Sequence, residues 1–452
     1  MRTVFISSFH GIIARNILLT PVLKRLREEA RVVILVPAFK KSYFEKTFDA
    51  KGVEIVGIKH KPTAADLFFR SWALAASKTR GLYIKYRSKF HQDGRLFSFL
   101  AASVPSRLGV GSCLGIWLLH FCDKLFFGKW NGVFGEVFDT YQPVLVFAAD
   151  IQNELDVRLL EEAKRRGVKT VGMVRSWDNL STKGVIRVMP DMLITHNEVV
   201  KAEAINWCFV EEGKIRVTGI PHHDRYQSKP PISREEFLRN FGFADTNRKL
   251  ILFAPIGNRY IRRNTLDQKV LETISGLNAN VLVRLPPGDR VDFGEIAGAN
   301  AQIVFDKTGV SFEGEDVKSN EVGEQDDIRL WCSVRYADVV VTGQSTVVLD
   351  AALCGKNSVI IGFDAEPLVY WDSIRRYYDY EYYQNIVKTG GLIIVRSPEE
   401  LRAAVKKCLA DPAFNAEARK KMILEQEYKL DGGSSERLAS IVLDALKENE
   451  HG

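Results

Sequence analysis

The segment 338–364 combines an apolar run, a Thr-Gly-Gln-Ser-Thr turn and a stretch that predicts a short helix. Backbone N–H groups at the start of such a helix, together with the helix dipole, suit a diphosphate. Gln344, Ser345 and Thr346 bring polar side chains to this turn, and Asp350 lies one helical turn beyond, where a carboxylate suits ribose hydroxyls. The alternative is that Ser345 only caps the helix and Asp350 is a solvated helix residue.

Two loops that follow apolar runs supply further phosphate-binding candidates. Gly257 allows a close approach of the backbone, and Arg259 suits the charge of a leaving phosphate. Arg284 ends the next apolar run. Because strands of a parallel sheet end at one edge, we expect these residues to lie near the turn at 342–346.

His10 follows the first apolar run, close to Arg15 and Asn16. An imidazole, whose pKa is ordinarily near neutrality, is suited to act as a general base. The alternative is a histidine at the surface or at a helix N-cap.

The cluster Trp177-Asp178-Asn179 follows the run at 169–174. Trp177 offers a stacking face, and Asp178 is a second candidate base. A structural loop in which Asp178 caps a turn explains the same residues. Asp150 leaves the run at 144–148 similarly and is a weaker candidate.

The elements that must position these residues alternate between apolar runs and helical patterns, which is typical of parallel sheets with crossover helices. We expect two doubly wound domains, at 1–225 and 226–452, the second beginning with a helix capped by Ser233. The expected strands lie at 3–8, 32–37, 53–58, 144–148, 169–174, 191–195 and 215–219, then at 249–255, 280–286, 301–305, 338–343, 358–363 and 392–395.

Residues 63–130 interrupt the alternation and predict a helical insertion in the first domain. The insertion mixes Phe, Leu and Trp with basic residues, which suits an anionic membrane surface. A buried insertion with solvated charges is the alternative. The basic residues include Arg70, Lys78, Arg80, Lys85, Arg87 and Lys89.

Four segments resemble bacterial surface-polysaccharide transferases of the GT-B class, namely nucleotide-sugar glycosyltransferases and CDP-glycerol glycerophosphotransferases. They are 173–184, 215–226, 338–364 and 431–446. The resemblance implies an α/β GT-B fold, in which two Rossmann-like domains face a cleft. It also implies that the second domain binds the nucleotide donor and the first receives the acceptor.

The residues that match the family's donor-binding pattern are Ser345, Thr346 and Asp350, and the residue patterns above supply the other candidates. The donor-binding residues would be Gly257, Arg259, Arg284, Gln344, Ser345, Thr346 and Asp350. Arg15, Asn16, Trp177 and Asn179 would lie on the acceptor side, with His10 and Asp178 as candidate catalytic residues. The loop at Arg284 departs from the family's Arg-x-His-Pro pattern, because Leu285, Pro286 and Pro287 follow it. The turn Gly219-Ile220-Pro221, with Asp224 after it, resembles a family turn that sets an interdomain hinge.

Composition narrows the function classes. The 452 residues carry a formal charge of +7, and the sequence contains no nucleic-acid-binding module and no apolar run long enough to span a membrane. Its six cysteines are scattered without paired spacing, which is typical of reduced thiols. We therefore expect a cytoplasmic protein, peripheral on the inner face of the membrane, without a nucleic-acid partner. The chain has no Asp-x-Asp motif, and His222-His223 has no spaced third ligand, so we expect neither a metal nor another cofactor.

The leading hypothesis is a metal-independent glycosyltransferase. It would move a sugar from a nucleotide sugar to a hydroxyl of a cell-envelope polysaccharide or a lipid-linked glycan. The alternatives are a CDP-glycerol-type glycerophosphotransferase, a nucleotide-sugar 2-epimerase, whose Gly-Thr-Arg-Pro-Glu start is absent, and a non-enzymatic nucleotide-binding scaffold.

Overall fold

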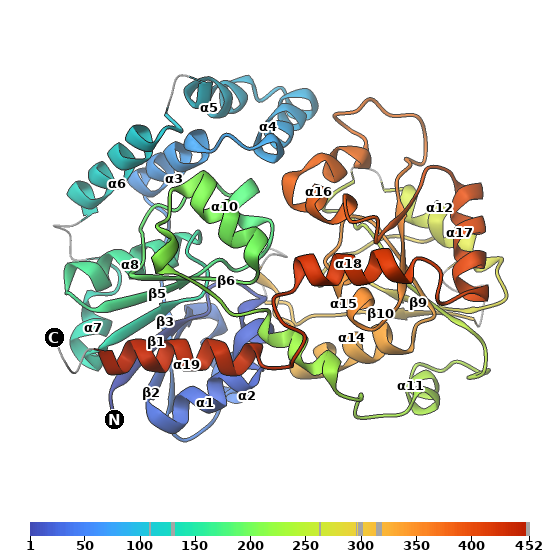
Figure 1. Cartoon of the computed structure of the whole chain (residues 1–452), viewed down its shortest axis with the longest axis horizontal. Coiled ribbons are helices and arrows are strands. Elements are labelled where there is room, and N and C mark those ends of the chain that lie inside the picture. The colour runs from blue at the N-terminus through green and yellow to red at the C-terminus, as the bar shows by residue number, and fades with distance from the viewer. Residues whose placement is uncertain are drawn as a thin grey trace. The chain divides into compact units, whose positions relative to one another are not determined.

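The computed structural model describes residues 1–107, 110–127, 132–261, 264–294, 296, 302–312 and 319–448. The chain forms two compact units (Figure 1). Unit 1 comprises Met1–Asp224 and Glu427–Gly452, and unit 2 comprises Arg225–Gln426. The first division falls beside the boundary predicted at 225. The segment from Glu427 onward, however, belongs to unit 1, and the prediction that it is part of the second domain is wrong.

The sheet of unit 1 has seven parallel strands in the order β3-β2-β1-β4-β5-β6-β7. The central strands β1, β2 and β4 are mostly apolar and buried because helices cover both faces of a parallel sheet. Every expected strand of this domain is present. They are β1 (Thr3–Ser7), β2 (Arg31–Pro37), β3 (Val53–Ile58), β4 (Leu145–Ala148), β5 (Lys169–Met173), β6 (Met192–Thr195) and β7 (Ile215–Val217).

The segment between β1 and β2 is not one continuous helix. A π-helical turn, η1 (Ala14–Leu18), is followed by α1 (Pro21–Glu29). Thr20 is the N-cap of α1, and Pro21 takes its first position. Proline has no N–H to donate and fits there, but not inside a helix, so the segment divides at this point.

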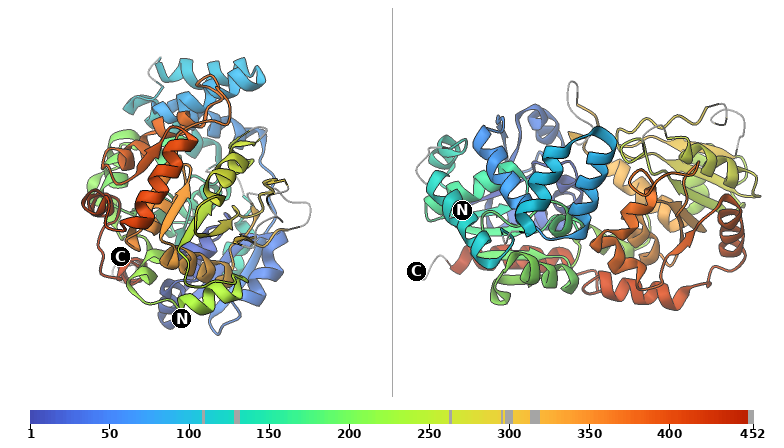
Figure 2. Two further views of the ribbon diagram at one scale, coloured as in Figure 1. Left: turned by 90° about the vertical axis from the view of Figure 1, so that its right-hand side faces the viewer. Right: turned by 90° about the horizontal axis from the view of Figure 1, so that it is seen from above.

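Helix α19 (Ser434–Lys447) returns the chain to unit 1 and packs beside α1 (Figures 1 and 2). Its residues Leu438, Val442 and Leu443 are buried in the same hydrophobic core as β1 and β2. The other helices of the unit outside the insertion are η2 (Ala38–Lys40), α2 (Lys41–Thr47), α7 (Gly135–Tyr141), α8 (Glu154–Arg165), α9 (Asn179–Thr182), α10 (Glu198–Cys208), η3 (Glu212–Lys214) and η4 (Pro221–Gln227), which runs into unit 2.

The predicted insertion is helical throughout its described part, and residues 108–109 and 128–130 lie outside that part. Its helices are α3 (Ala64–Ala76), α4 (Arg80–Asp93), α5 (Leu96–Arg107) and α6 (Cys113–Phe127), which lie together in Figure 1. Among the described residues, no helix has the length and apolar character needed to cross a membrane.

Buried charges join the insertion to the Rossmann-like core of unit 1. Arg158 of α8 donates a hydrogen bond to Glu161, whose pKa burial raises to about 8. Arg158 also pairs with Asp66 of α3, while Arg187 pairs with Asp123 of α6 and with Glu154. Burying such charges is favourable only when they are paired, so this network fixes the insertion to the sheet.

Unit 2 repeats the same plan with six parallel strands in the order β10-β9-β8-β11-β12-β13. They are β8 (Leu250–Ala254), β9 (Asn280–Arg284), β10 (Ile303–Asp306), β11 (Val339–Thr342), β12 (Asn357–Ile361) and β13 (Ile393–Val395), as the sequence predicts. The helices are α11 (Arg234–Asn240), α12 (Leu266–Ser275), α14 (Glu324–Tyr336), α15 (Val347–Leu353), η6 (Ile374–Asp379), α16 (Glu381–Val387), α17 (Pro398–Ala410) and α18 (Ala416–Gln426).

Candidate active site

A buried polar network lies at the carboxyl ends of β1, β4 and β5 in unit 1. Strand order reverses between β1 and β4, and open α/β sheets bind their ligands at such a point. Asp150 follows β4, and its carboxylate is 2.8 Å from Nε of Arg175, which follows β5. Asn179 donates to Asp150 over 3.1 Å and accepts from Arg175 over 3.3 Å.

His10 is joined to this network through Arg175. Nη1 of Arg175 lies 3.0 Å from both ring nitrogens, and the amide of Ile12 donates to Nδ1 over 3.4 Å. A guanidinium only donates hydrogen bonds, so the imidazole accepts and is neutral in this arrangement.

A second carboxyl group lies beneath the network. Ser7 donates to Asp156, which lies on α8, and accepts from the amide of Ala149 over 2.8 Å. Burial, and then the neighbouring Asp150, raises the pKa of Asp156 well above its usual range. The ends of β1 and β4 are thus tied together below His10.

The remaining acceptor-side candidates have different environments. Asn179 is fully buried within the network, so it positions other side chains and does not face an acceptor. Trp177 and Asp178 are half-buried in the loop after β5, and Asp178 accepts from Thr182 within the short helix α9. The geometry leaves both roles proposed for Asp178, base and turn cap, open.

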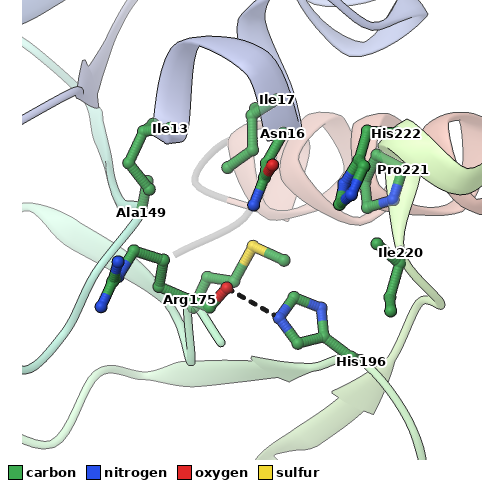
Figure 3. Close-up of a pocket in the computed structure, with 10 residues that line it drawn as sticks. Ile13, Asn16, Ile17, Ala149, Arg175, His196, Ile220, Pro221 and His222 are labelled. Carbon is green, nitrogen blue, oxygen red and sulfur yellow. Dashed lines mark hydrogen bonds between the residues drawn. The ribbon is translucent and has the colours of Figure 1, made fainter. Parts of the chain in front are cut away.

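Arg15 and Asn16 lie on the π-helical turn, where Arg15 donates to Asn16 over 3.0 Å. Figure 3 shows Asn16 pointing into a small cavity that His196 and His222 also line. The cavity measures about 10 Å³, which is room for about one water molecule. Burial lowers the pKa of His196 to about 4, so this ring is a neutral partner for the Arg175 carbonyl.

The Gly-x-Pro turn holds α19 within unit 1. A Cβ on Gly219 would lie 2.4 Å from Oγ of Ser434, and the Asp224 carboxylate accepts from the amides of Ser434 and Ser435 over 3.0 and 2.7 Å. Asp224 therefore satisfies the open amides at the start of α19 and complements its dipole. The contacts of this turn give it a docking role inside unit 1, where the sequence predicted a hinge.

In unit 2 the loops after β8 and β11 meet at the point where strand order reverses. A Cβ on Gly343 would lie 2.6 Å from Ile256, so glycine is required for this close contact. Gln344 and Ser345 are half-buried and Thr346 is exposed. Oε1 of Gln344 is buried without a hydrogen-bond partner among the described residues, while Oγ of Ser345 accepts from the amide of Val347. The N-cap of α15 is Thr346, so Ser345 contacts the first amide of the helix from the residue before the cap, and its role in donor binding stays a prediction.

Asp350 is less open than the sequence suggests. It is 5% exposed and accepts from the hydroxyl of Tyr226. Burial, followed by the charge of Asp350, raises the pKa of Tyr226 well above its usual range, so the phenol stays protonated and donates. A ribose would have to share Asp350 with this hydroxyl.

A buried carboxylate holds the loop that contains Gly257. Asp267 is fully buried and accepts from the amides of Ile256 and Gly257, each over 2.9 Å. A Cβ on Gly257, which has φ 88°, would lie 2.4 Å from Asp289. Glycine is therefore required here by the protein itself, whether or not a ligand approaches. Arg259 is exposed and remains a candidate for binding phosphate.

Arg284 is enclosed at the end of β9 and does not fit its predicted role. Its guanidinium pairs with Asp306 on the neighbouring strand and donates to the carbonyl of Asp326 over 2.7 Å. Because Asp306 already neutralises this guanidinium, the contacts of Arg284 do not support its predicted role in donor binding.

Sequence reasoning missed Arg175, His196, Asp267 and Tyr226. His196 directly follows β6 and Arg175 lies two residues after β5, so the signal was their place at the edge of the sheet. Nothing in the local sequence indicates the partners of Asp267 or Tyr226. Asp267 accepts from the amides of a loop, and Tyr226 donates to Asp350 on another helix.

No family model matches the chain. A sequence comparison with known proteins does find relatives, and those it finds are lipid-A-disaccharide synthases. The chain is 26% identical over 307 residues to a lipid-A-disaccharide synthase of Geobacter sulfurreducens, covering 65% of this chain and 73% of that protein. It is 23% identical over 305 residues to a lipid-A-disaccharide synthase of Trichlorobacter lovleyi, with the same coverage.

Solved structures resemble the chain over nearly its full length. A putative UDP-N-acetylglucosamine 2-epimerase from Listeria monocytogenes has a TM-score of 0.56 at 14% identity, with 99% of this chain and 97% of that one covered. The wall teichoic acid polymerase TagF has a TM-score of 0.52 at 12% identity, with 100% and 90% covered. At such identities the likeness shows the fold alone, which is GT-B. With the lipid-A-disaccharide synthases, it supports a GT-B glycosyltransferase of cell-envelope biosynthesis, the class that the sequence resemblance predicted.

Proposed function

We propose that the chain transfers a sugar from a nucleotide sugar to a hydroxyl of a lipid-linked cell-envelope glycan. The observation that carries the proposal is the sequence match to lipid-A-disaccharide synthases. The acceptor oxygen attacks the anomeric carbon, the bond from that carbon to the diphosphate breaks, and the hydroxyl proton passes to a base. Unit 1 supplies His10 or Asp178 as the base, and the leaving diphosphate meets Arg259 and the turn at 344–346 in unit 2.

The products distinguish this proposal from its alternatives. A glycosyltransferase releases a nucleoside diphosphate, a CDP-glycerol glycerophosphotransferase releases CMP, and a 2-epimerase converts the sugar nucleotide without releasing a nucleotide. We therefore propose incubating the full chain with UDP-sugars, other nucleotide sugars and CDP-glycerol, each with lipid-linked acceptors, and analysing the nucleotides by chromatography. Acceptor-dependent release of a nucleoside diphosphate is expected. Epimerised sugar nucleotide or CMP would replace the proposal with the corresponding alternative.

Donor binding is tested separately in unit 2. Arg259→Gln should weaken binding of the nucleoside diphosphate by about 1–3 kcal/mol, because a hydrogen bond to a charged group is lost. Arg239→Gln is the matched control, since Arg239 is another exposed arginine of this unit. Calorimetry that gives equal affinities for wild type and Arg259→Gln would remove Arg259 from the donor site.

We also propose that the insertion docks on a membrane. Apolar side chains point outward at helical spacing on α3, α5 and α6, and exposed apolar patches of this kind mark interaction surfaces. Phe97 is 88% exposed, Leu114 is 66% exposed, and basic residues such as Arg70 and Lys124 lie beside this surface. The exposed set comprises Leu67, Phe68, Leu96, Phe97, Leu100, Val104, Leu114, Trp117, Leu118, Phe121, Leu125 and Phe126.

Sedimentation with anionic vesicles tests this docking. Phe97→Asn together with Leu114→Asn should release the chain from vesicles at low salt, because two buried apolar contacts with the bilayer are lost. Leu424→Asn is the matched control, since Leu424 is 64% exposed on α18 of unit 2. If the wild-type chain does not sediment with the vesicles, or if Leu424→Asn reduces sedimentation as much as the double variant does, the insertion is not the docking surface.

A further inference from the structure

A second cavity of unit 1 lies outside the network at His10. It measures about 150 Å³ and is bounded by α3, α4, the start of α8 and the loops that follow β4 and β5. A water molecule occupies about 30 Å³ in the liquid, so this space holds several non-hydrogen atoms of a ligand.

The cavity has an excess of positive charge. Cationic side chains enter its wall from three elements, with Arg70 on α3, Lys85 and Lys89 on α4, and Lys183 after α9. Among its described lining residues the acidic one is Glu154, whose carboxylate already pairs with Arg187 at 2.7 Å. Cations on three sides of a small concave space favour an anion with several oxygen acceptors, such as a phosphate ester.

Two buried polar atoms of the wall lack hydrogen-bond partners within the described structure. They are Oε1 of Gln152 and Nε of Arg187, and Arg187 is only 5% exposed. Nε2 of Gln152 donates to the carbonyl of Gly184, which holds its amide in place. Buried polar groups in folded proteins are almost always hydrogen-bonded, so Oε1 of Gln152 calls for a donor from a ligand and Nε of Arg187 calls for an acceptor. A phosphate oxygen suits Nε, and a hydroxyl suits Oε1.

Residues that line the cavity share a loop and a helix with two features already described. Gln152 follows Asp150 of the buried network within the same loop, and Arg70 shares α3 with the outward-facing Leu67 and Phe68. The geometry points to a binding site for the phosphate ester of a lipid, seated between the proposed membrane surface and the proposed acceptor side. This inference rests on the proposed function, which it deepens by assigning the acceptor side a phosphate-binding site.

Calorimetry on the full chain without a nucleotide donor tests the site. The probes are dihexanoyl phosphatidic acid below its micelle concentration and inorganic phosphate. Arg70→Gln combined with Lys183→Gln removes two cations of the wall and should weaken binding of the lipid at least about tenfold. Lys51→Gln combined with Lys61→Gln is the matched control, because both lysines are exposed in unit 1 and neither lines the cavity, and it should bind like wild type.

The probes also distinguish the source of the phosphate. Lipid binding at least tenfold tighter than inorganic phosphate supports a lipid headgroup, whereas equal affinities support the phosphate chemistry but replace the lipid with a water-soluble phosphate ester. The proposal is overturned if the wild-type chain binds neither probe, or if the cavity variant binds like wild type. Because the assay contains no donor, a chain that fails to transfer sugar can still be tested for phosphate binding. If the chain transfers sugar but binds neither probe, the phosphate site is rejected and the proposed glycosyltransferase function is kept.

Discussion

Arg175 should be essential to unit 1 because it neutralises a buried charge. Asp150 is 2% exposed and Arg175 is 7% exposed, so Arg175→Met leaves a carboxylate that water does not solvate. Removing one partner of a buried ion pair costs about 3–5 kcal/mol of the free energy of unfolding. Asp150→Asn should cost a similar amount, since the guanidinium then lacks its counter-charge.

The double variant makes this reasoning testable. With both charges removed, neither partner is left buried alone, so the double variant should lose clearly less than the sum of the two single losses. Urea unfolding followed by tryptophan fluorescence measures all four proteins. Arg31→Met is the control, because Arg31 pairs with Glu54 at the surface of the same unit and should change little. Single losses below about 1 kcal/mol, or losses that simply add, would refute the account of Arg175 as a neutralising partner.

Three further predictions concern other groups. Burial raises the pKa of Glu161 from 4.5 to about 8, so the folded chain holds a proton that the unfolded chain releases, and stability should fall as pH rises through this range. Glu161→Gln should flatten that fall in urea midpoints measured between pH 5 and 8, and an unchanged slope would contradict the shift. His10→Gln should lower kcat by roughly 100-fold, and the wild-type rate should rise through about pH 6–7. If Asp178→Asn alone abolishes transfer, the base is the carboxylate. Transfer should also survive EDTA, and loss restored by manganese or magnesium would show that a metal takes part.

The strands of both sheets were predictable because each is a short apolar run of the length expected for a buried parallel strand. The position of α19 in unit 1 could not be predicted from the sequence in the same way. Its amphipathic pattern shows that one face is buried, but the pattern does not identify the partner. That partner is fixed by Asp224 and Gly219, which lie more than two hundred residues earlier in the chain.

The site was predictable to the same limited degree. The positions of His10 and Ser345 at the carboxyl edges of their sheets were predictable because each follows an apolar run, while their roles in catalysis and binding stay predictions. Arg284 lies at a similar edge, but Asp306 on the adjacent strand neutralises it. Arg175 and Asp150 belong together only because β4 and β5 are neighbours in the sheet. Charge pairing across strands decides which basic residues remain available, and a linear reading of the sequence does not contain it.

The return of α19 to unit 1 also governs how the chain folds during its synthesis. Unit 2 is continuous, so all its residues are translated before α19. Unit 1 begins first, but it lacks Leu438, Val442 and Leu443 of its core until the end. Domains ordinarily fold in the order in which they emerge, whereas here the first must wait for the last helix. The apolar residues of α1 that α19 covers therefore lack this partner while unit 2 is translated, and transiently exposed apolar surface of this kind favours aggregation.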